Sequence, residues 1–393
     1  MLNDRIKEIR INEYGGSEKK NTFVLDDGNK YLVKMPDPSR EKKSEVSYIN
    51  NAISEYIACQ IAASIGLPVQ ETFLDEYIAK NGKTKIVCAC KDFREPGEVL
   101  IEAEKIENSL EEVISNPTFA NTEMLLKEIP GLDYDKAMRQ YCRQFVLDAF
   151  IANPDRHNGN WGFLQSDGSI RMAPIYDCGS SLMPLIGNED LSLEKSRSSL
   201  SIPSAIRGEN GQRINYGEFL RATDNLWIKN ALCDVIPAIN MSRVRDIVNH
   251  TPFIADERKH FYNDMLEIRY QRILVPALEK IFIKEADREM DHDALHKFYE
   301  TNLKPLSQLP VFSPVKVNIR AEEKYFYAMK ISNRYAIAHT EHQMLGLLPI
   351  RSNDKEVARA VRAFAEIKIQ APEKEKDKSI GEKQEKNYDD LSI

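Results

Sequence analysis

Residues 153–162 read Asn-Pro-Asp-Arg-His-Asn-Gly-Asn-Trp-Gly, and a second polar stretch at residues 174–179 reads Pro-Ile-Tyr-Asp-Cys-Gly. In the first stretch, Asp155 precedes Asn160 by five positions. The second stretch supplies another carboxylate, Asp177, directly before a Cys-Gly pair. Carboxylate and amide oxygens are the protein ligands of Mg²⁺, which usually keeps phosphate or water in its other positions. The pattern therefore indicates a magnesium site that works together with a phosphate-bearing ligand.

The segment between these two stretches predicts a β-hairpin. Residues 161–164 and 170–173 are largely apolar and are joined by Gln-Ser-Asp-Gly, which is a turn sequence. Such a hairpin returns the chain, so that Asn160 and Asp177 come close enough to share metal ions. Asp155 then stays free of metal and orients an acceptor hydroxyl. Phosphoryl transfer from ATP requires this division of roles, because it needs positioning and charge stabilisation more than covalent chemistry from the protein.

Each of these patterns also arises by chance, and the alternative interpretation is a polar surface turn. The residues that lead into the first stretch argue against it. Residues 134–152 carry apolar side chains at helical spacing and predict a buried helix that ends near Pro154. The Asp-x4-Asn spacing also matches a kinase catalytic loop, and Asp-Cys-Gly matches the D-x-G form of a kinase metal motif. Their order and spacing together favour a catalytic site.

The upstream part of the chain offers a lysine for the phosphates. Residues 23–25 and 31–33 flank Asp-Asp-Gly-Asn, which predicts another hairpin. Lys34 ends its second strand on the same side as Leu32, and a lysine on an apolar face needs an anion. The alternative is a lysine whose ammonium group extends into solvent.

A helix is predicted between Ser44 and Gly66, because isoleucines recur there at every fourth position. Glu55 on this helix is the preferred partner of Lys34, since small residues beside it indicate close packing. The alternative partner is Glu45 near the start of the helix, where a carboxylate can simply complement the helix dipole.

Two backbone segments complete the predicted nucleotide site. Gly15, Gly16 and Ser17 precede the first hairpin strand, and glycines allow backbone N–H groups to approach phosphate oxygens. A plain turn is the alternative there, and the chain has no Walker motif. Asp92 and Phe93 follow an apolar strand-like run, at the place where a hinge backbone would bind adenine.

The composition limits the classes of protein that fit. The chain has 393 residues, with 54 Lys and Arg against 61 Asp and Glu, so its net charge is −7 and binding to nucleic acid is not expected. No apolar stretch reaches the length of a membrane span, and the N-terminus does not resemble a secretion signal. Six cysteines without a C-x-x-C pattern suit reduced thiols. These features predict a cytoplasmic protein, and they leave open its delivery elsewhere as an effector.

Four regions are predicted along the chain. Residues 1–95 form a nucleotide-binding N-lobe and residues 96–285 a catalytic C-lobe. Residues 286–369 form an appendage of unknown role, in which residues 324–329 are strand-like and residues 357–364 are helical in pattern. Residues 370–393 are predicted to be a disordered tail, because they are highly charged and nearly without apolar side chains.

These motifs resemble those of the HipA-like serine/threonine protein kinases, in particular their compact, CtkA-like branch. The similarity runs through motifs from Tyr-Leu-Val-Lys at residues 31–34 to Asn-Tyr at residues 215–216, and it covers roughly residues 10–285. The resemblance implies an α+β, two-lobed protein-kinase-like fold, with a small β-rich N-lobe and a mostly helical C-lobe. It also implies ATP and Mg²⁺ as cofactors and a protein hydroxyl as the acceptor. The resemblance further implies that Lys34 binds the nucleotide phosphates, that Asp155 is the catalytic aspartate, that Asn160 and Asp177 hold Mg²⁺, and that His157 supports the loop.

The sequence departs from the family in two respects. The N-terminal subdomain by which HipA toxins dock an antitoxin is absent from this sequence, so an antitoxin partner is not established. The appendage has no counterpart in the family. The resemblance also makes Ser17 a candidate autophosphorylation site, with a plain turn as the alternative. Two other functions remain open: a phosphoinositide or small-molecule kinase, and a nucleotide-binding scaffold.

Overall fold

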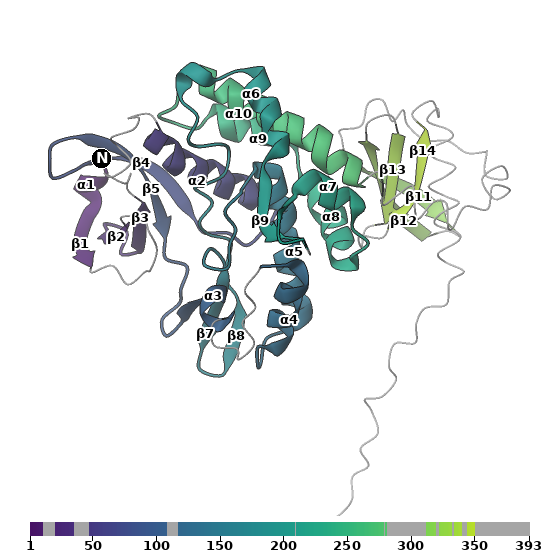
Figure 1. The fold of residues 1–393 in the computed structure, drawn as a ribbon, viewed down its shortest axis with the longest axis horizontal. Coiled ribbons are helices and arrows are strands. Elements are labelled where there is room, and N and C mark those ends of the chain that lie inside the picture. The colour runs from purple at the N-terminus through teal and green to yellow at the C-terminus, as the bar shows by residue number, and fades with distance from the viewer. Residues whose placement is uncertain are drawn as a thin grey trace, which may run out of the picture.

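The computed structural model describes residues 1–10, 20–34, 47–107, 117–208, 210–278 and 280, together with four strands between residues 312 and 349. These residues form a β-rich N-terminal lobe followed by a mostly helical C-terminal lobe (Figure 1). The α+β class and the two-lobed arrangement expected from the sequence are therefore confirmed. None of the described helices is long and apolar enough to cross a membrane.

The N-terminal lobe is built on a five-stranded antiparallel sheet with the order β1-β2-β3-β5-β4. The predicted hairpin is present as β2 and β3, and Gly28 in its turn has a φ of 78°, which disfavours any side chain. Lys34 is the last residue of β3 and pairs with Lys20 of β2 and with Cys88 of β5. The elements are α1 (Leu2–Arg5), β1 (Ile6–Arg10), β2 (Lys20–Leu25), β3 (Lys30–Lys34), β4 (Thr72–Ile78) and β5 (Thr84–Lys91).

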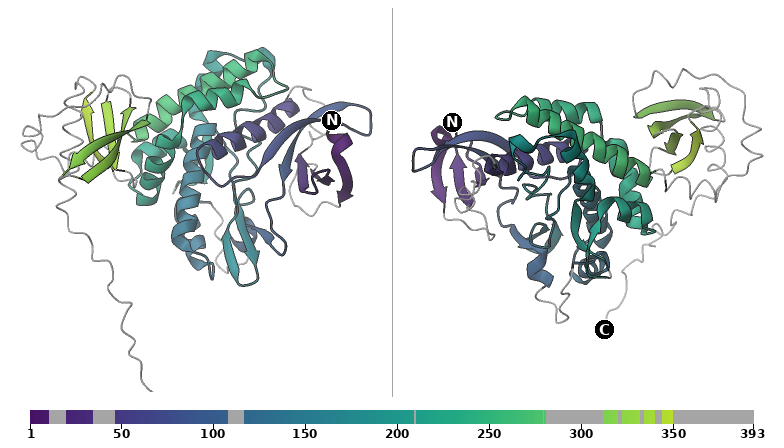
Figure 2. Two further views of the ribbon diagram at one scale, coloured as in Figure 1. Left: turned by 180° about the vertical axis from the view of Figure 1, so that it is seen from behind. Right: turned by 45° about the horizontal axis from the view of Figure 1, so that its top comes forward.

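Helix α2 (Ser47–Ser64) packs against β4, β5 and helix α9 (Met241–Asn249) of the C-terminal lobe. Figure 2 shows from two further sides that it lies between the sheet and the helices that follow. Of the predicted isoleucine stripe, Ile53, Ile57 and Ile61 are fully buried. The helix therefore connects the core of the N-terminal lobe to that of the C-terminal lobe.

The C-terminal lobe is organised around helix α5 (Tyr134–Ile151), whose last two turns are completely buried. The side chain of Asp133 caps the helix by accepting a hydrogen bond from the N–H of Lys136, and Ala152 ends it with a φ of 55°. The other helices are α3 (Ala103–Glu107), α4 (Phe119–Glu128), α6 (Leu193–Ser198), α7 (Tyr216–Ala222), α8 (Leu226–Ala238) and α10 (Asp256–Arg269), with 3₁₀ turns at Asn188–Asp190 and Ser199–Ser201 and a π-helical turn at Tyr270–Leu274.

The hairpin predicted between the two polar stretches is present as β7 (Gly162–Ser166) and β8 (Ser169–Met172), and β6 (Val99–Glu102) pairs with β7. The chain then meets the segment that follows α2. The backbone of Ile175 accepts a hydrogen bond from the N–H of Gln70 (2.9 Å) and donates one to the carbonyl of Pro68 (2.8 Å). These bonds attach the residues before Asp177 to the N-terminal lobe. Two later strands, β9 (Pro203–Arg207) and β10 (Arg213–Asn215), form a separate pair.

Part of the predicted appendage is described as a four-stranded antiparallel meander. Its strands are β11 (Phe312–Ile319), β12 (Glu322–Ile331), β13 (Arg334–His339) and β14 (Met344–Pro349). The predicted tail, residues 370–393, lies outside the described residues.

Candidate functional site

Lys34 lies at the centre of a cluster of charged groups between the two lobes. Its Nζ donates to Oε2 of Glu55 at 2.7 Å and to Oδ1 of Asp177 at 2.6 Å. The side chains of Lys34 and Glu55 are buried, whereas that of Asp177 is 24% exposed. Three predicted site residues from distant parts of the chain are therefore in direct contact.

Each member of this cluster comes from a different element. Lys34 ends β3, Glu55 lies in the second half of α2, and Asp177 follows the strand-like segment after β8. Asp177 has a φ of 57°, in the left-handed region that Asp and Asn tolerate better than most residues. The fold therefore turns the Asp177 carboxylate toward the N-terminal lobe through an unusual backbone conformation. The sequence offered Glu55 and Glu45 as partners of Lys34. The structure pairs Lys34 with Glu55, and Glu45 lies outside the described residues.

The loop after α5 holds Asp155 at the surface. Nδ2 of Asn160 donates to the carbonyl of Asp155 at 2.8 Å, and the hydroxyl of Ser180 donates to Oδ2 of Asp155 at 3.3 Å. The N–H of Asp155 donates to Oδ1 of Asn153 at 3.1 Å. The bonds to Asn153 and Asn160 fix the backbone of Asp155, and its side chain stays exposed beside Ser180. An exposed carboxylate on a fixed loop suits a group that meets a substrate from solution.

Arg156 connects this loop to the Asp177 segment from beneath. It is buried, and Nε and Nη2 donate to the two carboxylate oxygens of Asp148 at 3.0 and 3.1 Å. Nη1 donates to the backbone carbonyls of Asn160 (2.8 Å), Tyr176 and Asp177 (3.4 Å). One guanidinium group thus holds the backbone of both predicted metal ligands.

The groups around Arg156 keep its guanidinium group positively charged although it is buried. Burial alone lowers the pKa of the guanidinium group, but the Asp148 carboxylate and the Cys178 sulfur outweigh it and raise the pKa of Arg156 well above its ordinary value. Asp148 lies on the buried face of α5 and also accepts from Nδ2 of Asn153 at 2.9 Å. This ion pair therefore anchors the loop to the core helix.

His157 and two glycines shape the same loop. Nδ1 of His157 accepts from the N–H of Gly159 at 3.0 Å, while the imidazole ring lies at the surface. A Cβ on Gly162 would stand 2.2 Å from the carbonyl oxygen of Ile101, so no side chain fits there. His157 thus contributes one hydrogen bond within the loop.

The segment after β5 contains the predicted hinge residues. The carboxylate of Asp92 is held by Arg94, with Nη2 of Arg94 donating to Oδ2 at 2.8 Å, and the N–H of Asp92 donates to the carbonyl of Lys30 at 2.8 Å. The ring of Phe93 lies against that of Tyr176, with 5.8 Å between the centroids. Phe93 is therefore next to the segment that carries Asp177. The glycine loop, with Gly15, Gly16 and Ser17, lies outside the described residues.

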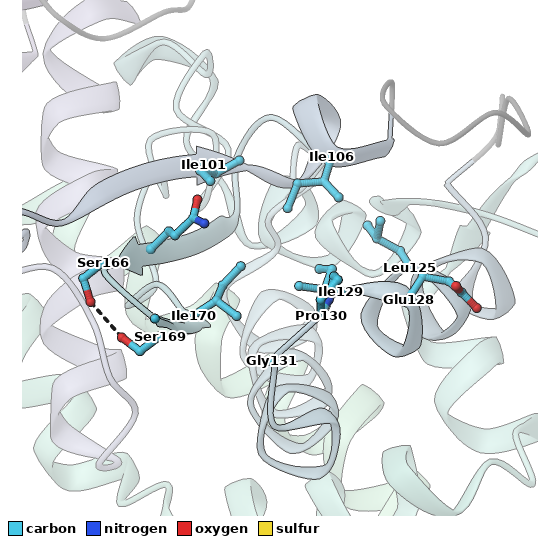
Figure 3. A pocket seen from close by; sticks show the side chains of 12 residues that line it. Ile101, Ile106, Leu125, Glu128, Ile129, Pro130, Gly131, Ser166, Ser169 and Ile170 are labelled. Carbon is cyan, nitrogen blue, oxygen red and sulfur yellow. Dashed lines mark hydrogen bonds between the residues drawn. The ribbon is translucent and has the colours of Figure 1, made fainter.

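A separate pocket of about 610 Å³ lies between the β7–β8 hairpin and the α4–α5 connection (Figure 3). Five of its twelve lining residues are isoleucine or leucine, and Glu128, Ser166 and Ser169 are among the polar ones. It shares no residue with the cluster around Lys34. The pocket is therefore distinct from the candidate catalytic site.

Comparison with known proteins identifies the family. Residues 13–250 match the model of the HipA-like C-terminal domain. The chain is also 34% identical over 275 residues to the serine/threonine-protein kinase CtkA of Helicobacter pylori, and this match covers 66% of the chain and 82% of CtkA. The chain belongs to the HipA-like kinase family. Membership makes it an enzyme of the serine/threonine kinase class, as the sequence motifs predicted.

A solved structure supports the same assignment within the HipA-like family. The crystal structure of the proinflammatory kinase CtkA from Helicobacter pylori matches 70% of this chain and 97% of the CtkA chain, with a TM-score of 0.63 and 30% identity. The similarity to the compact, CtkA-like branch of the HipA-like kinases is therefore present in both sequence and fold.

Sequence reasoning missed the residues that support this HipA-like site. Asp148 and Arg156 were not singled out, although a carboxylate inside the apolar run Phe-Val-Leu-Asp-Ala-Phe is a signal that a buried cation is near. The contact of Ser180 with Asp155 had no such signal, because it depends on how the Asp177 segment folds back.

Proposed function

We propose that the chain transfers the γ-phosphoryl group of ATP, with Mg²⁺, to a serine or threonine hydroxyl of a protein substrate. The observation that carries the proposal is the contact of Lys34 with both Glu55 and Asp177. A buried lysine held between two carboxylates is positioned to bind a phosphate oxygen, with Asp177 able to bind the metal on the same phosphate. Its family membership supports the same chemistry.

The residues present fit a Mg²⁺ ion. We assign the metal to Asp177 and Asn160, because Nδ2 of Asn160 already donates to the loop and its Oδ1 therefore points away as an acceptor. One carboxylate and one amide oxygen are the small protein contribution that Mg²⁺ accepts beside phosphates. When bound, the ion would supply charge stabilisation on the phosphates. Asp155 would accept the hydrogen bond of the substrate hydroxyl and orient its oxygen toward the γ-phosphorus.

The remaining nucleotide contacts are assigned by position. Lys20, the first described residue after Gly15, Gly16 and Ser17, pairs with Lys34, so the chain that follows these residues enters β2 beside the lysine that would bind phosphate. We therefore assign Gly15, Gly16 and Ser17 to the phosphates. Adenine would meet the backbone around Asp92 and Phe93 rather than the Asp92 carboxylate, because Arg94 holds that carboxylate.

The proposal is tested with radiolabelled ATP. The full chain is incubated with Mg²⁺ and, in parallel, with generic protein substrates, with phosphoinositide vesicles and alone. We expect label on protein hydroxyls, and no label when Asp155 is replaced by Asn. Label on phosphoinositides but not on protein would favour the lipid-kinase alternative. The absence of Mg·ATP binding in calorimetry would favour a scaffold.

Autophosphorylation at Ser17 is a further part of the proposed function. A phosphoserine adds a charge of about −1.5 to −2, and beside the ATP phosphates it would repel them. We expect the wild-type chain to acquire phosphate at Ser17 and to lose nucleotide affinity, whereas Asp155→Ala does neither. Ser17→Glu should bind Mg·ATP more weakly and Ser17→Ala should stay active longer. Equal Mg·ATP affinity in Ser17→Glu and wild type would end this part of the proposal.

The proposed partner is a protein with a hydroxyl acceptor, and we assign no antitoxin or nucleic acid. We also place the enzyme in the cytoplasm, a location supported by five buried cysteines that are free thiols. Fractionation of cells that express the chain, followed by detection with an antibody, tests this location. Recovery outside the cell would contradict it.

A further inference from the structure

Two thiols and a carboxylate meet in the interior directly behind Asp177. Cys59 lies one helical turn after Glu55 on α2, and Cys178 follows Asp177. Glu55, Cys59 and Cys178 are buried, with exposures of 0%, 1% and 0%. One ligand atom from each of the three lies within 4.8 Å of the others. Two elements far apart in the sequence thus place three metal-binding groups at one point.

The two oxygens of Glu55 face different partners. Oε2 accepts from Lys34 at 2.7 Å, whereas Oε1 faces Sγ of Cys59 at 3.9 Å. A cation held among the thiols can therefore use Oε1 while Lys34 stays on Oε2. Sharing one carboxylate would link the thiol cluster electrostatically to the lysine of the proposed nucleotide site.

The spacing suits a tetrahedral Zn²⁺ ion. With Zn–S bonds of about 2.3 Å, the ligand atoms of such a site lie about 3.5 to 3.8 Å apart. Sγ of Cys59 lies 3.9 Å from Oε1 of Glu55, and no two of the three ligand atoms are more than 4.8 Å apart. Each of these distances therefore has to shorten by about 1 Å or less to reach the spacing of a zinc site. Thiol ligands select zinc-like ions over Mg²⁺, which prefers oxygen.

The charges around the cluster fit an anionic metal complex. Two thiolates, one carboxylate and Zn²⁺ carry a net charge of −1. Nη2 of Arg156 donates to Sγ of Cys178 at 3.2 Å, and Lys34 lies on the other side of Glu55. These cations offset the net charge, and the hydrogen bond from Arg156 stabilises Cys178 as a thiolate ligand.

We propose that Glu55, Cys59 and Cys178 bind a zinc-class divalent cation, with water as the fourth ligand. Binding releases one proton from each thiol to solvent. The ion ties α2 to the Asp177 segment, and the contraction that binding requires displaces Glu55 and Asp177 from their contacts with Lys34. A chain that holds the ion therefore binds Mg·ATP more weakly. This consequence rests on the proposed function, whereas binding of the zinc-class ion does not.

Metal binding is measured on the full, reduced chain by competition for Zn²⁺ with a chromophoric chelator. We expect one equivalent of Zn²⁺, with affinity lowered at least 100-fold in Cys59→Ala and in Cys178→Ser. Cys233→Ala is the matched control, because this thiol lies on α8 away from the cluster, and it should bind like wild type. Cd²⁺ should produce a thiolate charge-transfer absorbance in wild type that Cys59→Ala lacks. Thermal unfolding without metal shows whether each variant is folded.

Three outcomes overturn the proposal. The first is a folded wild-type chain that takes up no Zn²⁺, and the second is Cys59→Ala retaining wild-type affinity. The third is loss of binding in Cys90→Ala alone, which would move the site to the neighbouring Cys88 and Cys90 pair, whose sulfurs lie 3.9 Å apart.

A separate titration tests the coupling to the nucleotide. Zn²⁺ should reduce the affinity of the wild-type chain for Mg·ATP at least tenfold and leave that of Cys59→Ala unchanged. Unaltered Mg·ATP affinity in a chain that has bound Zn²⁺ would overturn the coupling. A chain that binds Zn²⁺ but never binds Mg·ATP would contradict the proposed function and leave the metal site supported.

Discussion

Nζ of Lys34 lies 2.6 Å from Oδ1 of Asp177, although 143 positions separate the two residues in the sequence. Neither the strand that ends at Lys34 nor the turn that carries Asp177 encodes this contact by itself. It depends on α2, which supplies Glu55 to the same ammonium group and packs on both lobes. The pair therefore reports on the assembly of the whole site.

Removing the lysine should destabilise the chain as well as disable it. Lys34→Met leaves Glu55 buried without its cation, which typically costs about 3–5 kcal/mol of unfolding free energy. The double variant Lys34→Met, Glu55→Leu should recover much of this stability without recovering phosphoryl transfer. Urea unfolding and an ATP-transfer assay measure the two effects. A single variant as stable as wild type would show that the pair contributes little.

Asp155→Asn should lower the rate of phosphoryl transfer by about 10² to 10⁴-fold, the usual effect of losing a positioned proton acceptor. Affinity for Mg·ATP and thermal stability should stay at wild-type values, because the Asp155 side chain is exposed and the loop is fixed through its backbone. Single-turnover kinetics and calorimetry measure these quantities. Asp167→Asn, at the exposed tip of the β7–β8 hairpin, is the control. Full activity in Asp155→Asn would remove it from the proposed role.

Arg156→Lys should raise the Mg²⁺ concentration needed for half-maximal activity. Lysine keeps the positive charge but cannot reach Asp148 and the carbonyls of Asn160 and Asp177 together, so both metal ligands lose a common support. Activity measured across a Mg²⁺ series would show the shift. Arg143→Lys is the matched control, since Arg143 also pairs with an aspartate, Asp234, at 3.2 Å but is partly exposed. An unchanged Mg²⁺ requirement in Arg156→Lys would contradict this positioning role.

Asp177→Asn should weaken binding of Mg·ATP while the backbone keeps its shape, because Asn also tolerates the left-handed conformation found at this position. Asp177→Ala should lose the same affinity and in addition lose stability, by about 1 kcal/mol from the strained backbone. Calorimetric titration with Mg·ATP and thermal unfolding separate the two effects. Wild-type affinity in Asp177→Asn would exclude its carboxylate as a metal ligand.

Alkaline pH should loosen the β2–β3 hairpin through Tyr31. Burial, together with the 2.6 Å hydrogen bond to Oδ2 of Asp27, raises the pKa of Tyr31 to about 12. The folded pKa lies above the ordinary value of 10, so this stabilisation is complete below pH 10 and is lost as pH rises toward 12. Between pH 10 and 12 the unfolding free energy of Tyr31→Phe should therefore fall less steeply than that of the wild-type chain. Identical slopes for wild type and variant would contradict the assignment.

The parts of this fold that sequence could predict are those encoded locally. Asp-Gly turn chemistry predicted the hairpins, and helical spacing predicted α5 nearly to its ends. The choice between Glu55 and Glu45 depended on where α2 lies relative to β3, which no local pattern contains. Asp148 in its apolar run signals a buried cation, but the contacts of Arg156 with backbone carbonyls have no such signal, because any residue can supply a carbonyl. In the appendage, the sequence predicted only one strand. That strand lies within β12, which is one of the four strands of the meander.

The two hydrogen bonds that join Ile175 to Pro68 and Gln70 fasten the segment that directly follows α2, so a tilt of this helix would pivot near its C-terminal end. Glu55 lies nine residues before the last residue of α2, at a rise that amounts to about 14 Å along the axis. α2 is then a lever: a tilt of about 10° about its fastened end would carry Glu55 sideways by about 2 Å, enough to break its contact with Lys34.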